Sequence, residues 1–205
     1  MILFKQLRKK RYIFLTRRSL RNNIAILSEK NKLKLNIGSG ILSYQGWTDL
    51  NLPFFDLTSD KLWVYFFQGS PINNILLEHV LEHLTVDDVR HSLKLAKTYL
   101  VKNGRIRIAV PDKNHPNPEY IEYVRPNGSG PGADDHKSFW NYSDFLNLAK
   151  ELGYNYELFE YYKEDGELIM NELDEKNGIV TRTARNPSKG SIEDYSSLIV
   201  DLIAP

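Results

Sequence analysis

Three side chains that bind metals or transfer protons lie within five positions of one another, at His79, Glu82 and His83. The spacing i, i+3 and i+4 places them on one face if the segment is helical. Imidazole and carboxylate groups held in this way can bind a divalent cation, and a histidine with a pKa near neutrality can act as a general base. Alternatively, Glu82 and His83 only cap and brace the helix, and His79 alone faces a substrate. The sequence predicts a chemical site here and leaves its type open.

The same segment matches HxxEH, a pattern in which a class of zinc peptidases binds zinc through two histidines and uses the glutamate as base. Its setting disfavours that chemistry. A predicted buried strand, residues 74–78, directly precedes the motif, whereas these peptidases carry the motif on a helix of a different fold.

A second candidate site follows the first predicted strand, where the chain reads Asn36-Ile-Gly38-Ser-Gly40. Glycines allow a sharp turn that brings the backbone close to a ligand. The dinucleotide-binding fingerprint is incomplete, because its third glycine would fall at Ser43. Asp49, at the end of the next predicted strand, is placed to accept hydrogen bonds from two ribose hydroxyls. A turn or cap residue would have the same spacing.

Both candidate sites depend on elements that alternate along the chain from Leu33 onward. Apolar runs of strand length alternate with helical leucine patterns, which is typical of an α/β fold with a mostly parallel sheet. Ligands of such sheets bind beyond the carboxyl ends of the strands. The predicted strands are residues 33–37, 47–52, 74–78, 105–110, 154–162 and 197–203, and the predicted helices are residues 80–100 and 145–152.

Two irregular segments interrupt this alternation. Residues 113–135 are rich in Pro, Gly and Asn and follow a strand end, so we expect a loop that overhangs the site. Residues 163–190 join the last two strands and include Arg182 and Arg185. We expect a solvated hairpin there, or alternatively two cations that meet an acidic substrate.

Five segments in order, LKLNIGSG, GWTDLNL, NNILLEHVLEHL, LVKNGRIRIAVPD and SSLIVDLIAP, resemble the class I S-adenosylmethionine-dependent methyltransferases. More narrowly, residues 33–205 are similar to small bacterial methyltransferases with an HVLEHL segment. The resemblance implies a Rossmann-like, seven-stranded, mostly parallel sheet with an antiparallel last strand and helices on both faces. Only six residues, 41–46, lie between Gly40 and Trp47, whereas a helical crossover needs about ten to twelve. We therefore expect the first helix to be vestigial.

The resemblance also implies S-adenosylmethionine as the cofactor. Its methionine part would lie over the glycine turn, its ribose against Asp49 and its adenine near Asp56. Glu78, at a strand end, would contact cofactor or substrate. The implied cofactor-binding residues are Asn36, Gly38, Ser39, Gly40, Asp49, Asp56 and Glu78.

A divalent metal is implied by a narrower resemblance. In certain RNA-end methyltransferases and some quinone-precursor O-methyltransferases, an ExxEH segment at this place binds a metal, and the RNA-end enzymes add a histidine from a later HKFEW segment. This chain has HKSFW at residues 136–140, which implies a site formed by His79, Glu82, His83 and His136. Because His79 replaces the first glutamate, the expected ion shifts from magnesium toward zinc, manganese or iron. As the catalytic base for a hydroxyl acceptor, we expect His79 first and His136 second.

The composition narrows the chemistry further. The chain has 205 residues, no cysteine, and 27 Lys+Arg against 26 Asp+Glu. The lack of thiols excludes a disulfide framework, a cysteine-bound metal and methylation through a catalytic cysteine or a cysteine-held cluster. The longest apolar run, residues 63–67, is too short for a transmembrane segment, so we expect a cytoplasmic protein.

Charge is unevenly distributed along the chain. The first 28 residues hold eight basic residues and no acid, which leaves a net charge of −7 for residues 29–205. We predict a basic helical segment, residues 1–32, before a methyltransferase domain, residues 33–205. The segment is predicted either to contact an anionic membrane, nucleic acid or glycan, or to cover the domain. The apolar residues are Leu3, Leu7, Phe14 and Leu15 for partner contact, and Leu20, Ile24 and Leu27 for packing on the domain.

Together these features predict methyl transfer from S-adenosylmethionine to an oxygen of a sugar, a glycan precursor or another small metabolite. The alternatives are a metal-assisted RNA-end O-methyltransferase and a non-catalytic module of the same fold that binds a cofactor or a partner.

Overall fold

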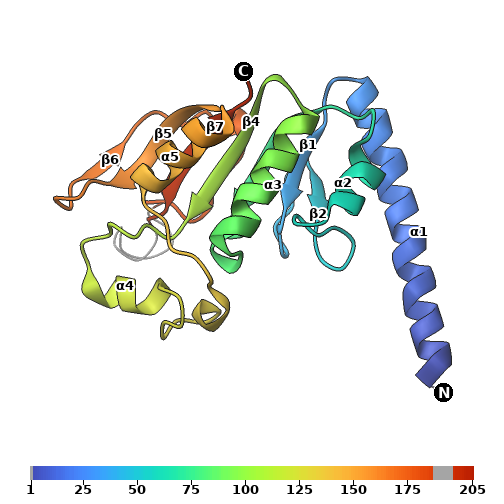
Figure 1. Cartoon of the computed structure of the whole chain (residues 1–205), viewed down its shortest axis with the longest axis horizontal. Helices are drawn as coiled ribbons and strands as arrows, with labels where there is room; N and C mark the ends of the chain where they lie inside the picture. Colours follow the sequence, from blue (N-terminus) through green and yellow to red (C-terminus); the bar gives the residue numbers. More distant parts are fainter. Residues whose placement is uncertain (1, 187–195) are drawn as a thin grey trace.

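The computed structural model describes residues 2–186 and 196–205 and is built around a mixed β-sheet. Within these residues the sheet has seven strands in the order β2-β1-β3-β4-β7-β5-β6 (Figure 1). The strands are β1 (Lys34–Ile37), β2 (Thr48–Leu50), β3 (Ile72–Glu78), β4 (Leu100–Val110), β5 (Asn155–Tyr162), β6 (Leu168–Met170) and β7 (Leu198–Ile203).

The strand directions place the carboxyl ends of β1 to β4 along one edge of the sheet. β1 pairs in parallel with β2 and β3, and β3 pairs in parallel with β4. β7 lies between β4 and β5 and is antiparallel to both, while β6 is antiparallel to β5. The predicted mostly parallel, seven-stranded sheet with an antiparallel last strand is confirmed.

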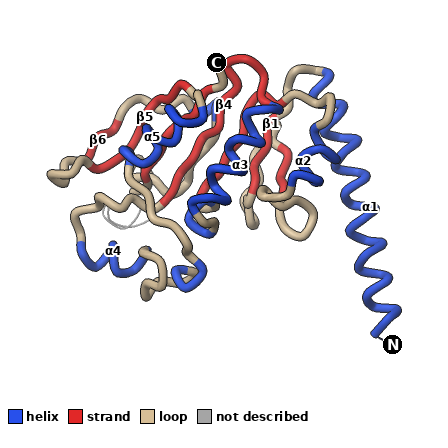
Figure 2. Tube along the Cα trace, in the orientation of Figure 1, coloured by secondary structure: helices blue, strands red, loops and turns tan. Residues whose placement is uncertain are grey.

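Within the part of the chain that the structure describes, the helices that pack on the sheet lie on one of its faces (Figure 2). Alternate strand residues such as Leu35, Ile37, Ile75 and Leu77 share one buried cluster with residues of four helices, because successive side chains of a strand point to opposite faces. We expected helices on both faces, and these four pack on the same one. They are α1 (Ile2–Glu29), α2 (Asp60–Phe67), α3 (Val86–Tyr99) and α5 (Tyr142–Leu152); the short α4 (Pro118–Val124) follows β4.

Irregular chain covers the other face of the sheet. There the buried residues Leu76 and Ile199 pack with Val180 and with the partly buried Trp47 and Leu173. Residues 38–47, between β1 and β2, form turns without a helix, so the expected vestigial crossover is confirmed. The remaining cover comes from residues 171–186, which we call the strap.

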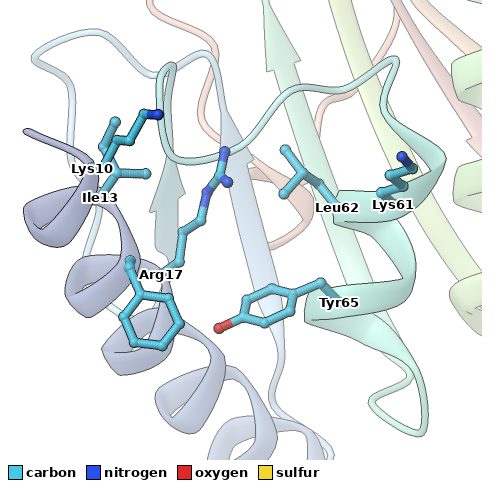
Figure 3. Close-up of a pocket in the computed structure, with 7 residues that line it drawn as sticks. Lys10, Ile13, Arg17, Lys61, Leu62 and Tyr65 are labelled. Atoms are coloured by element: carbon cyan, nitrogen blue, oxygen red, sulfur yellow. The ribbon is translucent and has the colours of Figure 1, made fainter. Parts of the chain in front are cut away.

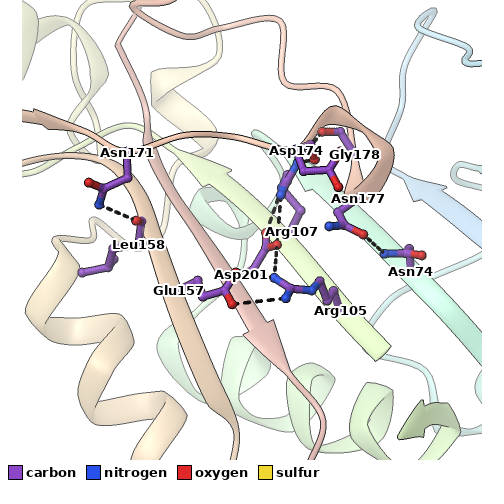
Figure 4. A network of polar contacts seen from close by, with 10 residues as sticks. All are labelled: Asn74, Arg105, Arg107, Glu157, Leu158, Asn171, Asp174, Asn177, Gly178 and Asp201. Atoms are coloured by element: carbon purple, nitrogen blue, oxygen red, sulfur yellow. Dashed lines mark hydrogen bonds and ion pairs between the residues drawn. The ribbon is translucent and has the colours of Figure 1, made fainter. Parts of the chain in front are cut away.

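A buried arginine fixes the strap to the sheet (Figure 4). Arg107 of β4 is fully buried and donates two hydrogen bonds to Asp201 of β7, at 2.8 and 2.9 Å. Its remaining guanidinium nitrogen donates to the backbone oxygens of Asp174 and Gly178, both at 2.7 Å. The buried charge is therefore paired, and the guanidinium joins β4, β7 and the strap.

A buried carboxylate holds the far end of the strap. Glu160 of β5 is fully buried and accepts hydrogen bonds from the Arg185 guanidinium, the Thr183 hydroxyl and the backbone N–H of Ala184. The expectation of a solvated hairpin is therefore wrong for Arg185, although the Arg182 side chain is exposed. The last part of that predicted segment, residues 187–190, lies outside the described residues.

The predicted helix over residues 80–100 begins later than expected. Residues 81–83 form one 3-10 turn, and α3 begins at Val86, where the Thr85 hydroxyl accepts a hydrogen bond from the Asp88 N–H as an N-cap. His79 lies before the turn with φ of 53°. The three side chains at positions 79, 82 and 83 therefore do not share an α-helical face.

Two further segments discussed in the sequence analysis, residues 113–135 and the basic N-terminal segment, contain helices. Residues 113–135 contain α4, capped by Asn117, and a 3-10 turn at Ala133–Asp135. α1 packs on the domain through Leu20, Ile24 and Leu27, as predicted for a covering helix. Among the helices of the described residues, none combines the length and apolarity needed to cross a bilayer.

Candidate functional site

The turn after β1 brings backbone to the carboxyl edge of the sheet. Gly38 and Gly40 have φ of 71° and 57°, a region that suits glycine. A Cβ on Gly38 would lie 2.5 Å from Cγ2 of Val80, whereas a Cβ on Gly40 would have no heavy atom within 4 Å. The turn is therefore packed against Val80 on one side and open beside Gly40. The open side is where a ligand can approach the main chain.

Asn51, which the sequence analysis did not select, faces this turn. Its Oδ1 accepts the Gly40 N–H at 3.1 Å, and its Nδ2 donates to the Ser39 hydroxyl at 2.8 Å. β2 ends at Leu50, so Asn51 is the first residue beyond the strand. A prediction that ended this strand at Leu50 would have identified Asn51 as a candidate ligand contact, because ligand contacts in these sheets follow the strand ends.

Asp49 lies two residues earlier, and both of its oxygens already have donors. Oδ1 accepts the Asn36 amide at 3.0 Å, and Oδ2 accepts the Ser43 hydroxyl at 2.6 Å. The Asn36 amide also donates to the Leu42 carbonyl. In this geometry Asp49 and Asn36 brace the short crossover between β1 and β2.

Glu78 and Asp56 also accept hydrogen bonds from nearby chain. Glu78, at the end of β3, accepts the Thr181 N–H, the Thr181 hydroxyl and the Arg182 N–H at 2.7 to 2.9 Å, so it ties the strap to the carboxyl edge of the sheet. Asp56 accepts from Thr58 within its own turn.

The phenol of Tyr44 lies near the same edge. Burial, together with the charges of Glu78 and Asp49, raises its pKa to about 12. Its hydroxyl is buried and has no hydrogen-bond partner among the described residues. Tyr44 therefore stays protonated and offers an unused polar group.

Glu82, His83 and His136 form a cluster that can hold a metal ion. One ligand atom from each lies within 4.8 Å of the others, and the rings of His83 and His136 meet edge to face at 4.8 Å between centroids. His136 Nδ1 lies 2.7 Å from the Val124 carbonyl, so Nδ1 donates and Nε2 keeps its lone pair. The sequence separation of 54 positions is bridged because the Lys137 and Ser138 N–H groups donate to the Glu82 carbonyl.

The Glu82 carboxylate is buried, with 1% of its surface exposed. Burial raises its pKa, but the charge and hydrogen bond of His79 more than offset this, and the pKa lies below its usual value. Glu82 is therefore ionised at neutral pH. Its Oε2 has no hydrogen-bond partner among the described residues, which fits a position left for a cation.

His79 lies beside this cluster. Its Nδ1 is 2.9 Å from Glu82 Oε1, and its Nε2 is 3.0 Å from the Ser197 hydroxyl. His79 therefore orients the Glu82 carboxylate, as residues behind metal ligands commonly do. Its positive φ is unusual for a residue with a side chain and is maintained by its surroundings.

Val80 connects the two parts of the site. Its side chain packs on Gly38, and Glu82 follows two residues later along the 3-10 turn. The glycine turn and the cluster are therefore neighbours at the carboxyl edge of β1 and β3. A set of two histidines and one carboxylate suits zinc, iron or manganese and leaves coordination positions open.

Comparison with known proteins supports the fold. A scan against protein-family models finds no match, and neither does a search of curated proteins. A DUF574 family protein from Streptomyces avermitilis has a similar structure, with a TM-score of 0.52, 9% identity, and coverage of 92% of this chain and 82% of that one. A SAM-dependent methyltransferase from Archaeoglobus fulgidus gives 0.46 at 17% identity over 94% and 93% of the chains. Magnesium protoporphyrin IX methyltransferase from Synechocystis, solved with bound SAH, gives 0.45 at 10% identity over 93% and 84%. The strand order and the likeness to the DUF574 family protein support a Rossmann-like α/β fold.

Proposed function

We propose that this protein is an S-adenosylmethionine-dependent methyltransferase that methylates an oxygen of a sugar, a glycan precursor or another small metabolite. The observation that supports this most directly is the contact of Val80 with Gly38, which puts the glycine turn beside the Glu82, His83 and His136 cluster. One part of the site can bind a cofactor close to the main chain, and the adjoining part can bind or deprotonate a hydroxyl.

The residues divide into a cofactor set and an acceptor set. Gly40, Ser39 and Asn51 would hold the cofactor, which when bound supplies an activated methyl group and leaves the protein mainly to position it. Asn51 offers both a donor and an acceptor to ribose hydroxyls, once its bonds to the turn rearrange. Asp49 would brace the crossover that follows this turn and so hold the turn in place.

The acceptor set removes or polarises the hydroxyl proton. Glu82, His83 and His136 would hold a divalent cation, whose chemistry is to lower the pKa of a bound hydroxyl. Without a cation, His136 has a free lone pair on Nε2 that can take the proton. His79, the base predicted first, has Ser197 and Glu82 at its ring nitrogens, so it would first have to release one of them.

Calorimetric titration with S-adenosylmethionine and with its demethylated product tests the cofactor assignment. We expect binding of both and a thermal stabilisation that grows with ligand concentration. Asn51→Ala should weaken binding about tenfold, since it removes a polar contact of about 1.4 kcal/mol, whereas Asn73→Ala, which loses a bond to Asn31, should not. If the titrations gave no heat and neither ligand raised the unfolding temperature, the assignment as a methyltransferase would be refuted.

A second candidate function is metal-assisted methylation of an RNA end. It is favoured by the position of His136, which joins Glu82 and His83 from a distant segment. Assays with radiolabelled methyl donor should offer RNA oligonucleotides and glycan precursors in parallel. Transfer to RNA alone, abolished by a chelator, would select this candidate over the first.

A further inference from the structure

Helix α1 extends well beyond the part that is packed on the domain (Figure 1). It has 28 residues, so it is about 42 Å long. Near its C-terminal end, Ile24 is fully buried, and near its middle the Arg17 guanidinium donates to the backbone oxygens of Phe54 and Pro53 at 2.8 and 2.9 Å. Residues 5–12 are all exposed. The helix is therefore anchored at one half and presents the other half to its surroundings.

The presented half carries apolar and basic side chains on the same side. Leu7, Arg11, Phe14 and Arg18 recur at i, i+4, i+7 and i+11, which forms one stripe along the helix. Leu7 and Phe14 are 54% and 59% exposed, and the adjacent Leu15 is 50% exposed. This stripe differs from the packed one, in which Ile13, Arg17, Leu20 and Ile24 have the same spacing.

A groove between α1 and α2 adds three further cations (Figure 3). Its volume is about 520 Å³, and Lys10, Arg17 and Lys61 line it together with apolar residues. Arg21 lies 5.1 Å from the centre of the Tyr65 ring at the same helix pair. Asp60, the acidic residue next to Lys61 in the sequence, is paired with His91. The apolar lining consists of Ile13, Phe14, Leu62 and Tyr65.

The exposed half of α1 lies on the same side of the molecule as the candidate site (Figure 1). α1 and β1 are joined by residues 30–33 and run in opposite directions, so the N-terminal half of α1 extends past the carboxyl end of β1 (Figure 1). The glycine turn lies at that same end. A surface bound by α1 would therefore lie on the side of the molecule where the site opens.

We propose that α1 and its groove dock on an anionic phospholipid bilayer. Basic residues attract the helix to anionic headgroups, and the groove has the charge and volume for a phosphate with adjoining apolar chain. Exposed leucine and phenylalanine side chains lie between these cations, and they would lose contact with water on entering the acyl boundary. A nucleic acid would satisfy the cations and would leave both leucines in water.

Vesicle sedimentation tests this proposal on the full chain. We expect binding to vesicles of phosphatidylglycerol and phosphatidylcholine, and at least tenfold weaker binding to phosphatidylcholine alone. Each basic residue near an anionic surface strengthens binding roughly fivefold, so reversing three should weaken it about 100-fold or more. Serine at the three apolar positions should weaken it at least tenfold. The charge set is Arg8→Glu, Arg11→Glu and Arg18→Glu, and the apolar set is Leu7→Ser, Phe14→Ser and Leu15→Ser.

A matched control carries the same charge change elsewhere. The exposed residues Lys94, Lys102 and Lys150 lie on or next to α3, β4 and α5, so replacing all three by glutamate should change vesicle binding less than threefold. Circular dichroism and the unfolding temperature of every variant should match the parent protein. Absence of binding to anionic vesicles, or an apolar set that binds as tightly as the parent, would overturn the proposal. Binding to an RNA oligonucleotide without vesicle binding would also overturn it.

Discussion

Replacing Arg107 by methionine should cost far more stability than replacing an exposed arginine. The substitution removes both bonds to Asp201, which then keeps one bond from Arg105 at 3.2 Å, and leaves an ionised group in the interior. Breaking a buried pair costs about 3 to 5 kcal/mol, and the remaining Arg105 contact favours the lower value. The carbonyls of Asp174 and Gly178 also lose their donor, at about 1 kcal/mol each. We expect a loss of about 5 kcal/mol.

A double variant separates the two contributions. Arg107→Met combined with Asp201→Leu removes the isolated charge and leaves only the two strap carbonyls unpaired, so the loss should shrink to about 2 kcal/mol. Urea unfolding at pH 7, followed by the fluorescence of the three tryptophans, measures both values. Arg90→Met is the control: this arginine pairs with Asp87 and Glu151 at the surface, so its replacement should cost less than about 1 kcal/mol. A single variant that loses less than 2 kcal/mol, or a double variant no more stable than the single, would refute the reasoning.

The other predictions concern the metal cluster, the pH dependence and the glycine turn. After incubation with zinc or manganese and dialysis, the parent protein should retain about one metal ion per chain. His136→Ala should retain less than a tenth of that amount, whereas a variant at the exposed His91, His91→Ala, should match the parent. Equal metal retention by the two variants would contradict the assigned ligands. Burial raises the pKa of the Asp112 carboxyl to about 6 from 3.8. Because the folded protein then holds this proton more tightly than the unfolded chain, the free energy of unfolding should fall by about 3 kcal/mol as the pH rises from about 4 to 6. Urea titrations should show that this fall is absent in Asp112→Asn, and a parallel fall in both proteins would point to another group. Gly38→Ala should lower the free energy of unfolding by about 2 to 3 kcal/mol, since its Cβ would contact Val80 at 2.5 Å. The control Gly46→Ala has only the backbone cost of about 1 kcal/mol, because a Cβ there meets no heavy atom within 4 Å. Equal losses of the two variants in denaturant titrations would show that the Val80 contact relaxes without cost.

Much of the sheet could be predicted from local pattern. Strand-length apolar runs predict β1, β3, β5 and β7 to within two residues of their observed ends, because buried strands need continuous or alternating apolar residues whatever lies around them. The glycine turn was also predictable, since a turn that needs positive φ selects glycine.

The site residues depended on boundaries and long-range contacts that pattern does not determine. The spacing at positions 79, 82 and 83 predicts a shared face only if an α-helix is present, and Thr85 delays that helix by capping it at Val86. Asn51 instead of Asp49 faces the glycine turn because β2 ends at Leu50. A shift of two residues in a strand end therefore changes which polar group reaches a ligand.

The strap could not be predicted, because its contacts are made by charges in the interior. Arg107 and Glu160 look like solvent-facing residues of alternating strands, yet each is fully buried and is hydrogen-bonded to strap residues that lie 23 to 71 positions away in the sequence. One-sided helix packing follows from the same cause, since residues 171–186 occupy the face where helices were expected.

The position of β7 has a consequence for how the chain folds. β7 is the last strand in chain order, yet it lies between β4 and β5 and pairs with both. During synthesis, β1 to β4 can assemble first, and β5 with β6 can form a hairpin, but the two parts cannot join until β7 is available. Until then β4 and β5 each expose an unpaired edge that can recruit another chain. We therefore expect nascent or truncated chains that lack residues 198–203 to aggregate or to depend on chaperones.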